Sequence, residues 1–145
     1  MAYAFQVTVD SADPHRQAAW WAETLGWDVE GQDEAFIKDM IAKGYATDEQ
    51  TTVFEGRLVW KDGAAIRHPE ALPGGKPYRM LFNRVPEPKT VKDRIHVDIW
   101  VGEERREQER DKLVVRGATF LHAERQGPHS WMTMADPEGN EFCIS

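Results

Sequence analysis

The sequence contains a single cysteine, comparatively few basic side chains and no long apolar run. One thiol, that of Cys143, excludes an internal disulfide. No segment approaches the roughly 20 apolar residues that a membrane-spanning helix needs, so we expect no membrane partner. Lys and Arg number 18 against 25 Asp and Glu, which gives a formal net charge of −7. Because nucleic acids bind positive surfaces, we expect no nucleic-acid partner.

Recognisable catalytic signatures are also missing. The sequence has no phosphate-binding P-loop, no dinucleotide fingerprint and no pattern typical of a nucleophilic triad. Residues 1–7 lack the basic and apolar regions of a signal peptide, and we therefore expect a cytoplasmic protein. What remains is an ordinary composition, 41% hydrophobic and 10% aromatic over 145 residues. That composition suits one globular domain spanning residues 1–145.

Cys143 lies in the apolar run 142–144 and has two interpretations. It is either a small buried hydrophobe or a reactive thiol. A reactive thiol needs a nearby cation or helix N-terminus to lower its pKa. No basic residue flanks Cys143, so the inert, buried interpretation is favoured.

Two stretches of the chain show the same order of predicted elements. In the first, alternation over residues 5–10 predicts a strand, and Asp13 then caps a helix that ends at Gly26. In the second, residues 95–101 alternate in the same way, and a charged helix from residue 103 ends at Gly117. Each helix is followed by a short strand and a hairpin-like β region. The sequence therefore predicts a tandem repeat.

Further signals fill in the two halves. A helical insert is expected over residues 33–53, and a hairpin should join 57–60 to 64–67 through the turn at Lys61, Asp62 and Gly63. Glycine and proline predict a loop over 69–77. In the second half, residues 131–134 should pair with 141–144 across the turn 136–139.

The fold class predicted from these elements is α+β. Two tandem βαβββ modules with mixed or antiparallel strands are expected, with the helical insert in the first module. Module one spans about residues 1–84 and module two about 94–145. Two prolines in 85–89 exclude a central strand and predict an extended linker over 85–93.

Three segments carry a resemblance to a known family: residues 85–89, residues 95–98, and the run Asp-Pro-Glu-Gly-Asn-Glu-Phe at 136–142. With the repeat, they resemble the vicinal oxygen chelate superfamily of glyoxalase I, bleomycin-resistance proteins and extradiol dioxygenases. The closer similarity is to bacterial glyoxalase-like domain proteins. The resemblance implies that the sheets of the two modules curve together into one cupped, mixed or antiparallel sheet system, which holds a small-molecule ligand and any metal. It also implies a homodimer.

In metal-using members, ligands come from the first and last strands of each module. By position, the resemblance implies Gln6, His96 and Glu141 as ligands of a divalent metal such as Zn, Ni, Mn or Fe. The fourth position carries Arg79, whose guanidinium stays protonated and cannot ligate. We therefore expect no tightly bound metal, and we expect Arg79 to form an ion pair with Glu141 instead. His96 is then a cavity residue paired with Asp98, with metal ligation as the alternative.

Aromatic and histidine side chains complete the candidate site. Trp60, Trp100 and Trp131 alternate with polar neighbours, so they could form core or could stack on a planar ligand. The candidate ligand-binding residues are Gln6, Arg79, His96, Asp98, Trp60, Trp100 and Trp131. His129 precedes the Trp131 strand on a predicted rim, and it and Glu141 are the candidate catalytic groups.

Two functions remain open at this point. The favoured one is a metal-free protein that binds a small planar or oxygenated molecule. The alternative is a divalent-metal-dependent lyase, isomerase or dioxygenase-type enzyme, with Glu141 or His129 moving the proton. A weaker third interpretation is an interaction module that uses the charged helix 103–112.

Overall fold

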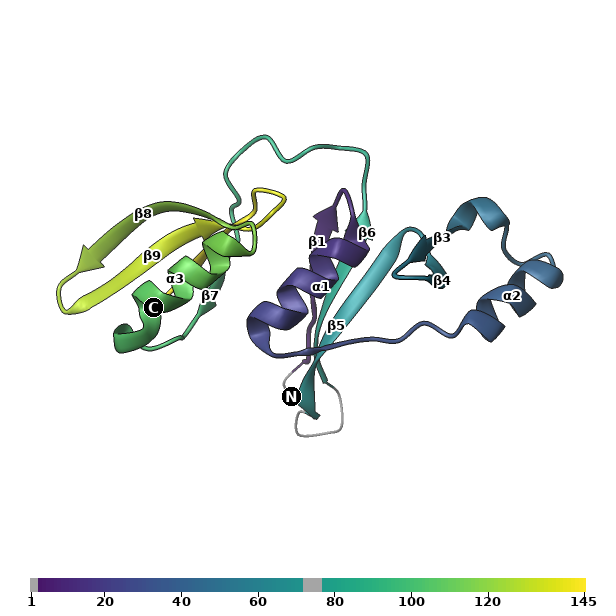
Figure 1. Ribbon diagram of the computed structural model, residues 1–145, viewed down its shortest axis with the longest axis horizontal. Helices are drawn as coiled ribbons and strands as arrows, with labels where there is room; N and C mark the ends of the chain where they lie inside the picture. The colour runs from purple at the N-terminus through teal and green to yellow at the C-terminus, as the bar shows by residue number, and fades with distance from the viewer. Residues whose placement is uncertain (1–2, 72–76) are drawn as a thin grey trace. The chain divides into compact units, whose positions relative to one another are not determined.

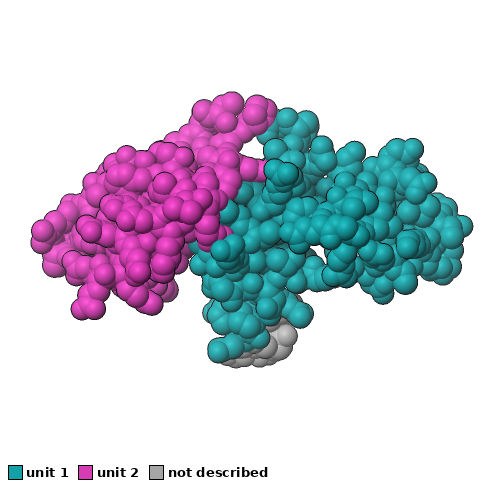
Figure 2. Space-filling model, in the orientation of Figure 1, with its two compact units in different colours: residues 1–87 teal, residues 88–145 magenta. Residues whose placement is uncertain are grey.

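The computed structural model describes residues 3–71 and 77–145 and divides the chain into two compact units (Figure 2). Unit 1 is Met1–Glu87 and unit 2 is Pro88–Ser145. The boundary between them falls inside the segment 85–93. No helix in the described ranges is long and apolar enough to cross a membrane.

The described residues of unit 1 form two α-helices, one 3₁₀ turn and six strands (Figure 1). In chain order they are β1 Val7–Ser11, α1 Pro14–Leu25, β2 Asp28–Val29, α2 Glu34–Ala42, the turn η1 Asp48–Gln50, β3 Thr51–Phe54, β4 Arg57–Trp60, β5 Gly63–Ala71 and β6 Pro77–Arg84. Unit 2 contains β7 Val97–Ile99, the turn η2 Glu103–Arg105, α3 Arg106–Val115, β8 Thr119–Gln126, β9 His129–Ala135 and β10 Glu141–Ile144.

The main sheets of the two units have the same topology. The strand order is β1-β6-β5-β2 in unit 1 and β7-β10-β9-β8 in unit 2. In each sheet the first strand pairs in parallel with the last, and the other neighbours are antiparallel. The prediction of an α+β fold built from two βαβββ modules is confirmed.

The two parallel strand pairs, β1 with β6 and β7 with β10, can be matched residue by residue. Val7 lies opposite Met80 in unit 1, and Val97 lies opposite Phe142 in unit 2. Gln6 and Arg79 therefore occupy the positions that correspond to His96 and Glu141. These are the correspondences that the family resemblance required.

Capping signals place the helices of unit 1 where the sequence predicts them. The Asp13 carboxylate accepts a hydrogen bond from the Arg16 backbone N–H at 3.2 Å. Gly26 then ends α1 with a left-handed φ of 66°, which costs little without a side chain. Asp33 caps α2 by accepting bonds from the backbone N–H groups of Ala35 and Phe36.

The predicted hairpin around Lys61–Gly63 is wrong. β4 pairs with β3 in a separate two-stranded sheet, whereas β5 pairs with β2 and β6. The turn of the actual hairpin is Glu55 and Gly56, whose φ values are 49° and 76°. Positive φ at both positions matches the right-handed twist of paired strands. The insert of unit 1 consequently extends to Trp60 and contains a hairpin as well as α2.

Two other predicted boundaries change. The loop predicted over 69–77 is partly strand, because β5 continues to Ala71. Residues 72–76 of that predicted loop lie outside the described part of the chain. The strand predicted over 95–101 is shorter, Val97–Ile99, so His96 and Trp100 flank it.

Alternation along the strands of unit 2 separates a core face from an open face. Met132, Met134, Phe142 and Ile144 are buried, as is Leu113 of α3, whose helix packs on β8 and β9. The residues between them on β9 and β10 point to the opposite side of the sheet. That opposite side carries the candidate site.

Candidate ligand cavity

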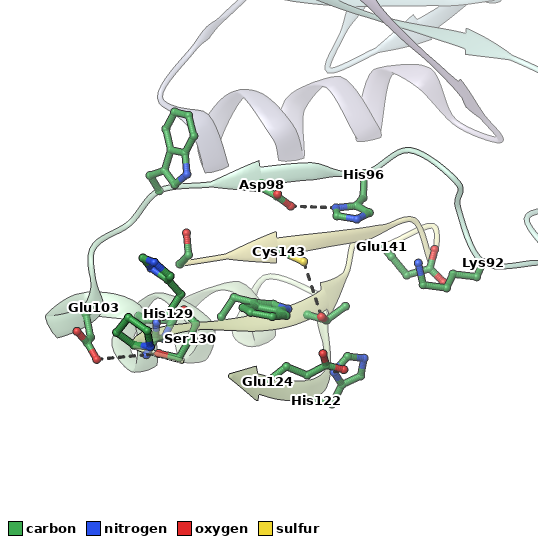
Figure 3. A pocket seen from close by; sticks show the side chains of 16 residues that line it. Lys92, His96, Asp98, Glu103, His122, Glu124, His129, Ser130, Glu141 and Cys143 are labelled. Atoms are coloured by element: carbon green, nitrogen blue, oxygen red, sulfur yellow. Dashed lines mark hydrogen bonds and ion pairs between the residues drawn. The ribbon is translucent and has the colours of Figure 1, made fainter. Parts of the chain in front are cut away.

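An open cavity of about 700 Å³ lies on this face of unit 2 (Figure 3). The residues that line it come from or flank β7, β8, β9 and β10, and Glu103 and Arg106 come from the start of the helical segment. The lining residues are Lys92, His96, Asp98, Trp100, Glu103, Arg106, His122, Glu124, Pro128, His129, Ser130, Trp131, Thr133, Glu141, Cys143 and Ser145.

A row of polar side chains crosses the floor of the cavity. Asp98 lies opposite Cys143, Cys143 opposite Thr133, and Thr133 opposite His122, so one residue comes from each of four strands. Direct cross-strand partners share a face of the sheet, which explains why they gather. His96 precedes this row by two residues along the chain, and its Nδ1 lies 2.9 Å from Asp98 Oδ1. The predicted pairing of His96 with Asp98 is thus present.

Cys143 is not the fully buried hydrophobe that the sequence favours. It is half-buried and lines the cavity, while its neighbours Phe142 and Ile144 fill the core. Its Sγ lies 3.7 Å from the Thr133 hydroxyl. Burial and the adjacent Asp98 carboxylate raise the pKa of the Cys143 thiol, and the Thr133 contact offsets this only in part. The thiol therefore stays protonated at neutral pH.

Glu141 stands at one end of the cavity in a compact charged cluster. Its carboxylate lies 2.9 Å from Lys89 Nζ and accepts a hydrogen bond from the Asp93 backbone N–H at 3.0 Å. The Glu141 N–H in turn donates to the Asp93 carboxylate at 3.1 Å. Burial alone would raise the pKa of Glu141, but the Asp93 N–H and the Lys89 ammonium lower it to about 2. Burial also raises the pKa of Asp93.

The expected ion pair between Arg79 and Glu141 is wrong, because each side chain has a different partner within its own unit. Arg79 binds Glu30 through two parallel hydrogen bonds of 2.9 Å, and it donates a third to Gln6 Oε1 at 3.0 Å. A planar guanidinium matches a carboxylate in this two-pronged geometry. Glu30 lies 49 residues from Arg79, and nothing local in the sequence indicates the pairing.

These contacts test the metal set that the family resemblance implies. The Gln6 amide oxygen already accepts from Arg79, and the Glu141 carboxylate already holds Lys89 and the Asp93 N–H. Arg79 at the fourth position is a cation. The residues present therefore do not fit a metal at Gln6, His96 and Glu141.

The three tryptophans proposed for the site, Trp60, Trp100 and Trp131, lie in three different environments. Trp131 is half-buried and lines the cavity, and Trp100 lines it with 88% of its surface exposed. Trp60 belongs to the hairpin of unit 1, where its backbone N–H donates to Gln32 Oε1 and its backbone carbonyl oxygen lies 2.7 Å from His15 Nε2. Trp60 is not among the residues that line this cavity.

The rim that includes His129 is held by a residue that the sequence analysis missed. The Arg106 guanidinium donates to the Ser130 carbonyl at 2.6 Å and to the Ser130 hydroxyl at 2.8 Å. His122 is a second missed residue, with its Nδ1 3.3 Å from the Glu124 carboxylate. Extending the alternation of 119–126 would have identified His122 and Glu124 as one face.

The repeated sheets and the open cavity define a class of small α+β proteins built from paired βαβββ modules. The family model described as "Glyoxalase-like domain" matches residues 6–145, and the chain belongs to this family. The resemblance found in the sequence is thereby confirmed. Comparison with curated proteins finds no match.

Solved structures with the same fold are distant in sequence. The fosfomycin resistance protein FosX from Mesorhizobium loti has a TM-score of 0.63 and 6% identity, covering 99% of this chain and 90% of its own. A glyoxalase/bleomycin resistance protein/dioxygenase family enzyme from Burkholderia phytofirmans has a TM-score of 0.57 and 14% identity. This match covers 96% of this chain and 94% of that enzyme. The bleomycin-binding protein from Streptomyces verticillus, complexed with copper(II)-bleomycin, has a TM-score of 0.53 and 13% identity. This match covers 100% of this chain and 96% of that protein.

Proposed function

We propose that this chain binds a small planar or oxygenated molecule in the cavity of unit 2. The observation that carries the proposal is the cavity itself, about 700 Å³ in volume, with aromatic and polar groups converging on it. Cavities of this size suit small organic ligands, which apolar walls bind and a few polar groups orient. Trp131 supplies a flat apolar surface, and the Asp98 row supplies hydrogen-bonding groups on the floor.

The proposed binding does not use a metal held at the family positions. The Gln6 and Glu141 oxygens are engaged by Arg79 and Lys89, which supports this part of the proposal. One solved structure with the same fold is a bleomycin-binding protein complexed with copper(II)-bleomycin, which supports the binding of an organic ligand by this fold. We further propose a homodimer, which rests on the family resemblance, and a cytoplasmic location.

A metal-dependent lyase, isomerase or dioxygenase is the second candidate. It is supported by His129, whose imidazole lines the cavity and is of the residue type most often used as a general acid or base. Glu141 is less suited to that role, because a carboxylate with a pKa of about 2 is a weak base.

Ligand binding should be measured by thermal shift against planar heteroaromatic compounds and small hydroxy acids and ketones. A compound that binds in the cavity should lose about fivefold or more in affinity with Trp131→Ala, since a stacked aromatic contributes roughly 1 kcal/mol or more. Trp60→Ala is the matched control and should leave affinity unchanged. A compound that binds Trp131→Ala as tightly as the original protein would contradict the assignment.

The same compounds distinguish binding from catalysis. Proton NMR of each bound compound after prolonged incubation should show it unchanged if the protein only binds it. Conversion that disappears with His129→Ala would instead support the enzyme.

A further inference from the structure

Three side chains with metal-ligating atoms meet on the cavity floor. One ligand atom each from His96, Asp98 and Cys143 lies within 4.8 Å of the other two. Figure 3 shows His96 and Asp98 beside each other and Cys143 on the adjacent strand. Asp98 and Cys143 are direct partners in the parallel register, and His96 is two residues before Asp98. The backbone therefore brings the three groups together.

The donor set selects the kind of ion. Imidazole nitrogen, carboxylate oxygen and thiolate sulfur are the three common ligands of Zn²⁺, at about 2.0–2.3 Å. The Cys143 thiol is protonated in the metal-free chain, so the ion would displace its proton to solvent on binding. Tetrahedral geometry at those bond lengths separates ligand atoms by about 3.3–3.8 Å, so separations of up to 4.8 Å must shorten by about 1 Å. His96 and Asp98, whose nearest atoms are 2.9 Å apart, would exchange their mutual hydrogen bond for bonds to the ion. The side chains of His96 and Asp98 are 39% and 55% exposed, which leaves their rotamers free to adjust. Hard ions such as Mg²⁺ and Ca²⁺ prefer oxygen alone.

The residues around the three groups support Cys143 and leave the side toward the cavity open. The Thr133 hydroxyl contacts Cys143 Sγ from β9 and can hold the sulfur in place. The cavity in front of the three groups leaves room for a fourth ligand, either water or an atom of a bound molecule. Three protein ligands with one open position is a recurring zinc geometry.

Unit 1 provides an internal comparison at matching register positions. There, Gln6 corresponds to His96, Thr8 to Asp98, and Leu81 to Cys143. An amide, a hydroxyl and an isobutyl group do not make a zinc site. The ligating chemistry is thus particular to unit 2 and is not a by-product of the repeated fold.

We propose that His96, Asp98 and Cys143 form a three-ligand site for a zinc-type divalent cation on the cavity floor. This set lies within unit 2 and shares only His96 with the set Gln6, His96 and Glu141 that the family resemblance implies. The proposal goes beyond the binding of an organic molecule and does not depend on it. With one position open, the ion should exchange reversibly.

Cobalt(II) titration of the whole chain, first treated with chelator and kept reduced with a phosphine, tests the site. One equivalent should bind and produce the near-ultraviolet charge-transfer band of a thiolate–cobalt bond, and zinc should then abolish the band by displacement. Cys143→Ser should remove the band, and His96→Ala and Asp98→Asn should each weaken zinc binding by at least about tenfold. Circular dichroism should show that each variant keeps its fold.

Two controls separate this site from its neighbours. His122→Ala removes an imidazole on the same face, and Gln6→Ala removes a ligand of the family set; both should leave zinc affinity within about twofold. Binding without the charge-transfer band would overturn the proposal, as would no binding at all. Loss of binding with Gln6→Ala would assign the ion to the family set instead. Organic-ligand binding by the metal-free protein is measured separately, so either proposal can fail alone.

Discussion

The carboxylate of Glu141 should make the stability of the chain depend on acid pH. Its pKa is about 2 in the folded chain, below the ordinary value of 4.5, because the Asp93 N–H and Lys89 outweigh the effect of burial. A folded-state pKa below the unfolded one means that the ionised form stabilises the fold. This contribution is complete above about pH 4.5 and is lost as the pH falls toward 2.

The size of the effect follows from the same two values. Each unit of pKa difference is worth about 1.36 kcal/mol, which gives an upper figure of about 3 kcal/mol. The Glu141 side chain is 16% exposed, so screening by solvent is limited but real. We expect Glu141→Gln to lower the free energy of unfolding by about 2 kcal/mol at pH 7.

Urea unfolding followed by circular dichroism at pH 7 and pH 3 measures this contribution. The gap between the original protein and Glu141→Gln should shrink to roughly half at pH 3, where the carboxylate of the unfolded chain is protonated. Glu87→Gln removes one exposed carboxylate from the adjoining segment and should change stability by less than about 0.5 kcal/mol at either pH. An equal gap at both pH values would refute the reasoning.

Three further substitutions test the packing and the turn. Arg79→Ala should cost about 1–2 kcal/mol in urea unfolding, because it leaves the half-buried Glu30 carboxylate unpaired, and adding Glu30→Gln should recover part of that loss. Phe142→Ala should cost about 3–5 kcal/mol by opening a cavity in the core of unit 2, and a melting temperature that hardly moves would contradict its burial. Gly56→Ala should cost about 1 kcal/mol in the same melts, because φ at this position is 76°, whereas no loss would mean that the hairpin turn is formed differently.

Local signals in the sequence were sufficient to predict the repeated modules. Asp13 and Asp33 cap their helices, and Gly26 ends the first one, through contacts that span only a few residues. The pairing predicted between 131–134 and 141–144 is present one residue later, between 132–135 and 141–144, and it follows from a short turn at Asp136. Features of this kind are fixed by neighbouring residues, so periodicity and turn chemistry suffice to identify them.

Pairings over longer distances were not predictable in the same way. Glu55 adopts a positive φ, which is uncommon for glutamate. The sequence therefore predicts a hairpin between β4 and β5, whereas β4 actually pairs with β3. The run Phe142, Cys143 and Ile144 is apolar throughout, and its alternation between core and cavity shows only in the sheet. Arg79 and Glu30 are brought together because β2, β5 and β6 are neighbours in one sheet. The sequence of any one of these segments does not indicate that contact.

The two units show how one backbone pattern supports different chemistry. In unit 1, Glu30 follows β2 and reaches across the sheet to Arg79, so that face carries an ion pair. In unit 2, Glu141 holds the position of Arg79 but turns to Lys89 instead. The remaining polar groups on the face of unit 2 are then left to line an open cavity. Glu141 is thus paired with Lys89 at the end of the sheet, and the floor beside it is where the proposed ligand would bind.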